Sequence, residues 1–255
     1  MKSITSSSSD FLVIRGGRKL RGRVKVSGSK NASLPILIAS LLTEEPCIVK
    51  RVPNLLDVKT TFELLNTLGA KVHFEEGKAF VHAQALNSYL APDRIVRRMR
   101  ASILVAGPLL ARFGRAVVGM PGGCSIGARL IDQHLKVFEK GGAVINVKEG
   151  YLRMEVPKIK PVEHTFEVIT VTGTENALMF LSRCPKRSVL RNVALEPEVM
   201  DLVEVLRKMG VEIEVEGRTM VIRGREDLAG FEHEVIPDRI EAGTLAVAGF
   251  LTGGE

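Results

Sequence analysis

Three cationic side chains stand where the sequence pattern predicts that helices begin: Lys30, Arg100 and Arg129. A cation near a helix N-terminus opposes the helix dipole, at a cost of roughly 0.3–1 kcal/mol. A bound anion removes this penalty, because backbone N–H groups and the cation then converge on it. The three positions therefore predict an anion-binding site, with ordinary solvated cations as the alternative.

The segment that leads to Arg129 adds a group that could transfer a proton. It reads Pro121-Gly-Gly-Cys-Ser-Ile-Gly-Ala-Arg129, and its glycines let the backbone approach a ligand closely. Cys124 lies close to a cation and to an expected helix start, surroundings that lower a thiol pKa and permit nucleophilic or proton-transfer chemistry. The other two cysteines, Cys47 and Cys184, fit small buried hydrophobic positions better.

The elements that must position these residues form an internal repeat. Three segments share an amphipathic helix, a glycine and two short strands: Phe62–Val81, Leu135–Met154 and Leu202–Val221. The glycines that end these helices, Gly69, Gly142 and Gly210, suit the left-handed C′ position.

A more apolar helix precedes each of these segments, over Asn31–Leu42, Arg100–Phe113 and Thr174–Ser182. Because a helix that is apolar on most sides is buried, we expect these three to share a core. The predicted fold is therefore α/β, with strand-helix-strand-helix-strand-strand units arranged with pseudo-threefold symmetry around buried helices.

The repeat also provides an internal control for the cations. The buried helices of the third and fourth copies are expected to begin with Glu175 and Glu241, and two surface helices with Asp57 and Glu198. These acids have the sign that the helix dipole favours. The cations therefore depart from the pattern of their own siblings.

Both ends of the chain look incomplete. A fourth copy begins near Glu234 and stops at Glu255, and the predicted opening strands Phe11–Arg15 and Arg23–Ser27 have no evident partner. We expect residues 30–236 to form a first lobe of three repeats, and residues 1–29 and 237–255 to be fragments of an incomplete second lobe. The alternative is a terminal helix packed at the edge of one domain.

Composition narrows the class of partner. Thirty-six Lys and Arg against 29 Asp and Glu give a net charge of +7, which favours anionic partners. With no Trp and two Tyr, the chain has few platforms for stacking bases, so we expect small phosphorylated ligands and no nucleic acid. The longest apolar stretches are shorter than the roughly 20 residues of a membrane span. We therefore expect a cytoplasmic location and no membrane partner, and the scattered histidines predict no metal site.

Five motifs together resemble the UDP-N-acetylglucosamine 1-carboxyvinyltransferase family, the enolpyruvyl transferases of the first committed step of peptidoglycan synthesis. They are Gly28-Ser-Lys-Asn-Ala32, Met99-Arg-Ala-Ser102, Pro121-Gly-Gly-Cys-Ser-Ile-Gly-Ala-Arg129, Thr172-Gly-Thr-Glu-Asn176 and Pro237-Asp-Arg-Ile-Glu-Ala-Gly-Thr244. The resemblance implies a cytoplasmic monomer of two three-repeat lobes that needs no cofactor and serves cell wall biogenesis, cell shape and cell division.

The resemblance also implies a reaction and a role for each site residue. The 3-hydroxyl of UDP-N-acetylglucosamine attacks C2 of phosphoenolpyruvate while C3 is protonated, and phosphate then leaves. By this resemblance Lys30 and Asn31 hold phosphoenolpyruvate, and Arg100 and Arg129 bind anionic groups of the two substrates. Cys124 is the proton donor. The residues along the UDP-sugar are Leu130, Ile131, Asp132 and Gln133.

Two other functions compete with this interpretation. The shikimate-pathway enolpyruvyl transferase resembles it in fold and in its use of phosphoenolpyruvate, but lacks the cysteine-bearing glycine-rich loop. A non-catalytic repeat protein that binds anions or nucleic acid would also explain the net positive charge.

Overall fold

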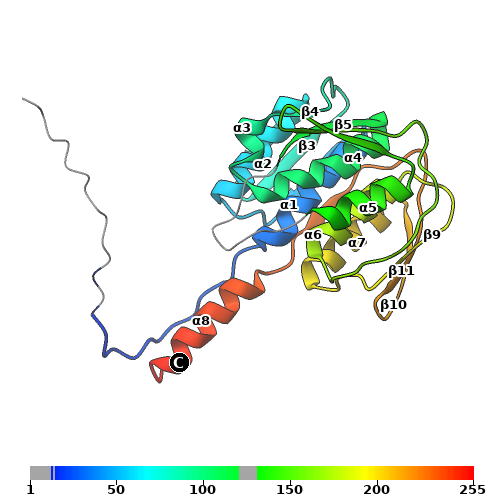
Figure 1. Ribbon diagram of the computed structural model, residues 1–255. Coiled ribbons are helices and arrows are strands. Elements are labelled where there is room, and N and C mark those ends of the chain that lie inside the picture. Colours follow the sequence, from blue (N-terminus) through cyan, green and yellow to red (C-terminus); the bar gives the residue numbers. More distant parts are fainter. Residues whose placement is uncertain (1–12, 14, 121–130) are drawn as a thin grey trace, which may run out of the picture. The chain divides into compact units, whose positions relative to one another are not determined.

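The structure is a computed structural model that describes residues 13, 15–120 and 131–255 (Figure 1). The described chain divides into two compact units. One is Ser27–Asp238, and the other is the described part of Met1–Val26 together with Arg239–Glu255. All three repeats lie in the first unit.

The first repeat begins with a helix and lacks a strand of its own in front of it. Its elements are α1 (Lys30–Ala39), which continues as the 3-10 helix η1 (Ser40–Leu42), then β1 (Cys47–Lys50), α2 (Leu56–Leu68), β2 (Lys71–Glu75) and β3 (Lys78–His82).

The second and third repeats each begin with a strand. The second contains β4 (Leu90–Ala91), α3 (Asp93–Val96), the 3-10 helix η2 (Arg100–Val105), α4 (Ala106–Phe113), β5 (Arg115–Gly119), α5 (Asp132–Lys140), β6 (Val144–Lys148) and β7 (Tyr151–Glu155). The third contains β8 (Glu163–Thr165), α6 (Val171–Leu181), β9 (Ser188–Arg191), α7 (Pro197–Lys208), β10 (Glu212–Glu216) and β11 (Thr219–Arg223), and β12 (Glu232–Glu234) follows it.

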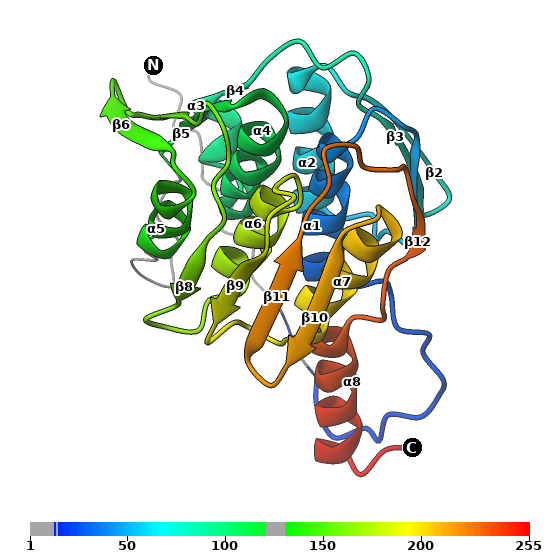
Figure 2. The same cartoon turned by 90° about the vertical axis from the view of Figure 1, so that its right-hand side faces the viewer.

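Each repeat builds a four-stranded sheet of the same topology. The strand orders are β12-β1-β3-β2, β4-β5-β7-β6 and β8-β9-β11-β10, with the first pair parallel and the other pairs antiparallel. Figure 2 shows the third sheet with α6 and α7 behind it. The predicted α/β repeat fold is confirmed.

The strand missing from the first repeat comes from the far end of the unit. β12 pairs with β1 in parallel, with Ile48 opposite Glu232. A buried pair fixes β12 to α7, because His233 Nε2 lies 2.8 Å from Asp201 Oδ1. The segment from Glu234, expected to open a fourth repeat, therefore begins within the strand that closes the first sheet. The expectation that Arg23–Ser27 is a strand was wrong, because no described segment pairs with it as a ladder.

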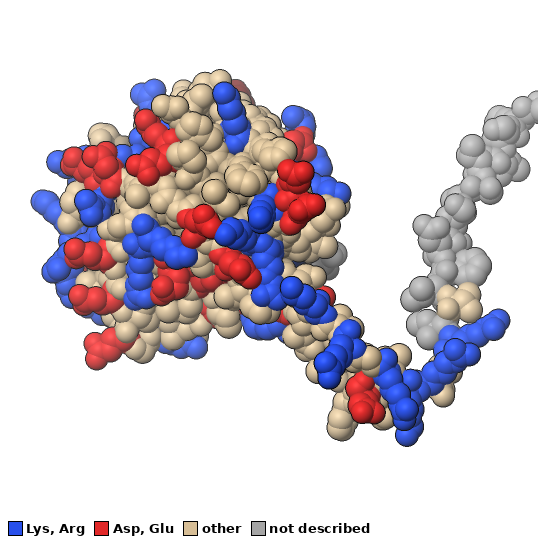
Figure 3. Space-filling model, turned by 180° about the vertical axis from the view of Figure 1, so that it is seen from behind, with Lys and Arg blue, Asp and Glu red and all other residues tan. Residues whose placement is uncertain are grey.

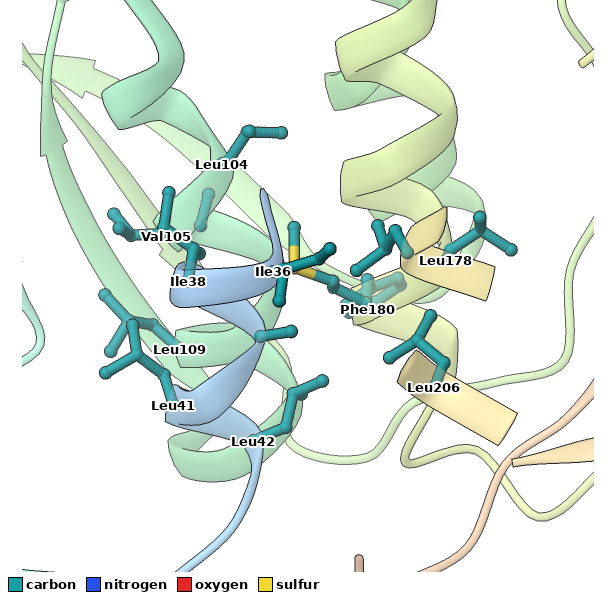
Figure 4. Packing of buried hydrophobic residues seen from close by; sticks show 14 of the residues in the cluster. Ile36, Ile38, Leu41, Leu42, Leu104, Val105, Leu109, Leu178, Phe180 and Leu206 are labelled. Carbon is teal, nitrogen blue, oxygen red and sulfur yellow. The ribbon is translucent and has the colours of Figure 1, made fainter. Parts of the chain in front are cut away.

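Three helical segments fill the core, as their apolar sequences predicted. α1, η2 with α4, and α6 bury nearly all of their apolar side chains. Figure 4 shows Ile36 of α1 beside Phe180 of α6, and Leu109 of α4 on the other side of α1, with Leu206 of α7 near Phe180. The amphipathic helices α2, α5 and α7 cover the cluster with one face each.

The helix ends follow the predicted glycine pattern. Gly69, Gly142 and Gly210 have φ values of 102°, 96° and 100°, which is the left-handed region. A side chain is strained at such a φ, so glycine is required for the chain to turn directly from each surface helix into its first strand.

Three helices begin at other residues than the sequence predicted. Arg100 begins a 3-10 helix and the α-helix begins only at Ala106, which places Pro108 in the first turn where its missing N–H is tolerated. The helix expected from Arg129 begins at Asp132. α6 begins at Val171, so Glu175 lies in its second turn and is buried.

In its described residues, the second unit contains helix α8 (Arg239–Leu251) and the extended segment before residue 27. Backbone bonds join Gly22 N–H to the Glu255 carbonyl and Glu255 N–H to that of Leu20. Helix α8 leaves large apolar side chains in solvent, with Phe250 86% exposed. In Figure 3 Lys and Arg gather along the extended segment, whereas both signs of charge intersperse over the larger unit.

Because the core is shared by all three repeats, a cavity made at its centre should strongly lower the free energy of unfolding. Phe180 is fully buried and packs edge-on against Phe138, with ring centroids 5.0 Å apart. Replacing Phe180 with Ala should lower the free energy of unfolding by about 3–5 kcal/mol, measured by urea denaturation. Phe80→Ala is the control, because Phe80 is 40% exposed and should cost much less. Equal losses in both variants would contradict this account of the core.

Candidate active site

The start of α1 fixes Lys30 from both sides. Ser29 caps the helix, since its hydroxyl accepts a hydrogen bond from Ala32 N–H at 3.3 Å. The Lys30 N–H donates to Asp238 Oδ2 at 3.1 Å, so a residue from the far end of the unit holds the first turn. Asn31 beside it is exposed. The backbone of this predicted phosphoenolpyruvate-binding pair is therefore anchored while its side chains remain accessible.

The Lys30 ammonium lies at the start of a second helix as well. Its Nζ is 2.9 Å from Oδ2 of Asp57, in the first turn of α2. Both side chains are about one-third exposed, at 38% and 33%, and such ion pairs are individually weak. The carboxylate therefore orients the ammonium without a large energetic barrier to exchange with an incoming anion.

The second cationic group lies at the junction of η2 and α5. Arg100 is partly buried, and its positive charge acts on His134 of α5. His134 is almost completely buried, and burial together with the Arg100 charge lowers its pKa to about 4. The structure thus brings Arg100 close to the first turn of α5, where the predicted UDP-sugar segment ends.

The side chains of that first turn are tied to the loop before α6. Buried Gln133 accepts from Glu167 N–H at 3.1 Å, and its amide nitrogen donates to Asp132 Oδ2 at 2.9 Å. The Gln133 bond, and Lys136 beside it, hold the pKa of Asp132 below its usual range. Gln133 is therefore committed to shaping this turn, and Ile131 is its N-cap residue.

The predicted site residues fall into two described groups, Lys30 with Asn31 and Arg100 with Ile131, Asp132 and Gln133. Cys124, Arg129 and Leu130 lie outside the described residues. Cys47 and Cys184 are buried, as predicted, and burial raises the pKa of the Cys47 thiol to about 12.

Sequence reasoning missed three residues next to these groups. Asp238 caps the first turn of α1, and Asn176 and His134 bond to each other beside η2. The sequence signal for Asn176 was its position directly before the apolar run Ala177–Leu181. A polar amide that is buried together with such a run needs a hydrogen-bond partner.

Across the ranges 15–120 and 131–255, no three His, Cys, Asp or Glu side chains are grouped as a metal ion would require. Likewise, none of the helices in these ranges has the length and apolar character needed to cross a bilayer.

Glu175 is an unusual carboxyl group within α6. It is 2% exposed, and no described group hydrogen-bonds to its Oε1. Burial, and then the charges of Glu198 and Glu196, raise its pKa to about 8. The acid that was expected to favour the helix dipole is thus held in its neutral form at pH 7.

The raised pKa predicts a pH-dependent stability. The unfolded carboxyl ionises near 4.5 and the folded one only near 8, so the free energy of unfolding should fall as pH rises through this window. The slope from this one group is at most roughly 1.4 kcal/mol per pH unit. Glu175→Gln should remove it, becoming more stable than the wild type above pH 8 and losing that advantage below 4.5. Urea denaturation across this range checks the sign; parallel curves for the two proteins would refute it.

Comparison with known proteins identifies relatives of this chain. It is 49% identical over 245 residues to the UDP-N-acetylglucosamine 1-carboxyvinyltransferase of Dichelobacter nodosus (strain VCS1703A), covering 95% of this chain and 58% of the relative. It is 48% identical over 252 residues to that of Koribacter versatilis (strain Ellin345), covering 96% and 58%. The chain thus spans a little over half the length of these curated relatives.

Solved structures agree with the fold. The enolpyruvyl transferase NikO from Streptomyces tendae matches with a TM-score of 0.80 at 25% identity, over 91% of this chain and 55% of that one. EPSP synthase from Acinetobacter baumannii matches with a TM-score of 0.68 at 17% identity, over 87% and 51%. Residues 14–255 also match the family model of EPSP synthase (3-phosphoshikimate 1-carboxyvinyltransferase). The chain is therefore a homologue of UDP-N-acetylglucosamine 1-carboxyvinyltransferase and belongs to the EPSP synthase family of carboxyvinyl transferases.

Proposed function

We propose that this chain supplies one lobe of an enzyme that transfers the enolpyruvyl group of phosphoenolpyruvate to the 3-hydroxyl of UDP-N-acetylglucosamine. Phosphate is the other product, and the reaction belongs to peptidoglycan synthesis. The observation that carries the proposal is the identity of nearly half of all positions to relatives that have this name. The partly exposed cations at the starts of α1 and η2, Lys30 and Arg100, support it, because both substrates are anionic.

Lys30 and Asn31 are the proposed phosphoenolpyruvate-binding pair. The Lys30 ammonium is already oriented by Asp57, and the exposed Asn31 side chain lies next to it in sequence. An incoming phosphate or carboxylate replaces one partly exposed carboxylate partner of Lys30 with another anion, which costs little desolvation.

Arg100 and Arg129 are the proposed partners for anionic groups of the two substrates, and Leu130–Gln133 the segment along the UDP-sugar. Within this segment the Gln133 amide is occupied by Asp132 and Glu167. The proposed role of Gln133 is therefore to hold the shape of the turn against which the nucleotide sugar lies. Cys124 is the proposed acid that protonates C3 of phosphoenolpyruvate.

The remaining proposals concern the whole protein. Residues 30–236 form the first lobe, and residues 1–29 and 237–255 belong to a second lobe, as a cytoplasmic monomer. The exposed apolar side chains of α8 support this assignment, because a helix of such composition is stable when other elements cover it. The relatives are also longer than this chain.

Ligand titration tests the substrate assignment. UDP-N-acetylglucosamine and phosphoenolpyruvate should bind in isothermal titration calorimetry, whereas single-stranded DNA should not. The family model makes 3-phosphoshikimate the necessary competing ligand. Preference for 3-phosphoshikimate would favour the shikimate-pathway reaction, and tight binding of DNA alone would favour a non-catalytic nucleic-acid-binding protein.

Variants of the cations sharpen this test. Lys30→Ala and Arg100→Ala should each weaken binding by about 1.5–3 kcal/mol, the range for hydrogen bonds to charged groups. Thermal unfolding should change little. The matched control is Arg223→Ala, since Arg223 is an exposed cation on β11. Loss of stability with unchanged affinity would show that Lys30 and Arg100 have structural roles.

The acid role of Cys124 is tested by turnover in a protein of the relatives' full length. Cys124→Ser should abolish phosphate release, because a hydroxyl is far too weak an acid. Cys124→Asp should retain some activity with its optimum at lower pH. An epoxide analogue of phosphoenolpyruvate should alkylate the wild type and spare both variants. Undiminished phosphate release by Cys124→Ser would rule out the acid role.

A further inference from the structure

The side chain of Asn176 is inserted into the backbone of a neighbouring helical segment. Its Oδ1 accepts from Gly107 N–H at 2.8 Å, and its Nδ2 donates to the Ile103 carbonyl at 3.0 Å. Residues 103 and 107 are four apart, so an uninterrupted α-helix would join these two groups directly. The Asn176 amide from α6 takes the place of that bond.

This insertion coincides with the change of helix type. The chain is a 3-10 helix over Arg100–Val105 and an α-helix from Ala106. Gly107 lies so close to α6 that a Cβ atom there would be 2.4 Å from Asn176 Oδ1 and 2.7 Å from the Asn176 carbonyl oxygen. Glycine is therefore required for the two helices to make this contact, and the contact sets the path of the segment that bears Arg100.

The same amide reaches α5 through His134. The Asn176 Nδ2 is 3.0 Å from His134 Nδ1, and His134 Nε2 is 3.3 Å from the Thr172 hydroxyl oxygen. Because Gly107 N–H can only donate, the Asn176 oxygen faces it and the nitrogen faces His134. His134 Nδ1 must then be the acceptor, so the imidazole proton is on Nε2 and points to Thr172.

The charges around His134 keep it in this neutral form. Burial dominates, the Arg100 guanidinium disfavours a second positive charge, and the Asp132 carboxylate opposes both weakly. The imidazole is therefore available as an acceptor for the Asn176 amide throughout the neutral pH range.

We propose that Asn176 and His134 are positioning residues that lock the Arg100 segment, the first turn of α5 and the start of α6 into one preformed surface for the UDP-sugar. This inference rests on the proposed function, since it names the substrate that the surface receives. Neither side chain is required to touch the substrate, because both are fully buried. Their effect passes through Arg100 on one side and through Ile131, Asp132 and Gln133 on the other.

Hydrogen exchange tests the structural half of the inference on this chain without ligand. Asn176→Leu keeps the bulk of the side chain and removes its hydrogen bonds, and Gly107→Ala displaces the amide. Both should speed amide exchange over residues 100–107 and 131–136, and leave the β10–β11 hairpin protected. Ser182→Ala is the matched control, because Ser182 is the equally buried C-cap of the same helix and its hydroxyl donates to the Leu178 carbonyl of that helix.

Calorimetry tests the functional half. UDP-N-acetylglucosamine should bind Asn176→Leu and Gly107→Ala about tenfold more weakly than wild type, a difference of roughly 1.4 kcal/mol, and should bind Ser182→Ala normally. If Ser182→Ala binds UDP-N-acetylglucosamine as weakly as the other two variants, Asn176 contributes only to the stability of the fold, and the inference is overturned. Failure of the wild type to bind would instead count against the proposed function, and exchange alone would then decide whether the lock exists.

A tautomer measurement on the wild type tests the hydrogen-bond network directly, and one variant then tests the role of the Asn176 amide. Long-range ¹H–¹⁵N spectra of wild-type His134 should show a proton on Nε2 and none on Nδ1 at neutral pH. In Asn176→Asp the new carboxylate should draw the proton to Nδ1 and raise the pKa of His134 above about 4. A wild-type imidazolium, or a proton on Nδ1, would overturn the proposed network.

Discussion

The structure depends on one constraint, which is that three apolar helical segments can leave water only by packing against one another. A single repeat offers one sheet and one amphipathic helix, too little to enclose α1, η2 with α4, or α6 alone. Together they form one continuous cluster with nearly complete burial. Lys30 and Arg100, which are proposed to bind the substrates, begin two of these segments, so the packed core holds the backbone of both residues in place.

Closure of the first repeat by β12 links the site to the far end of the unit. The first sheet takes its outer strand from residues 232–234, and the following residues bring Asp238 to the Lys30 amide, 208 positions away in sequence. The buried His233–Asp201 pair holds the strand in place on α7. The position of the proposed phosphoenolpyruvate-binding residues is therefore a property of the complete three-repeat unit rather than of the first repeat.

Burial also determines which groups carry charge. His134 and Glu175 lie in the interior on α5 and α6, and desolvation moves the pKa of each toward the neutral form. Lys30 and Arg100, by contrast, are only partly buried. The interior can thus tolerate polar side chains as neutral hydrogen-bonding groups, while the electrostatic attraction for an anion is concentrated at the surface.

The sequence by itself determined the repeat, the buried helices, the glycine-terminated surface helices and the family, because each of these follows from local periodicity or from a contiguous motif. It could not predict that Arg100 begins a 3-10 helix, that Glu175 is buried and neutral, or that β12 completes the first sheet. These features depend on partners that are distant in sequence: the Asn176 amide between Ile103 and Gly107, the carboxylates at the start of α7, and the edge of β1. Only the tertiary structure decides them, because the energy of a buried polar group or a strand edge is set by the atom that reaches it in space.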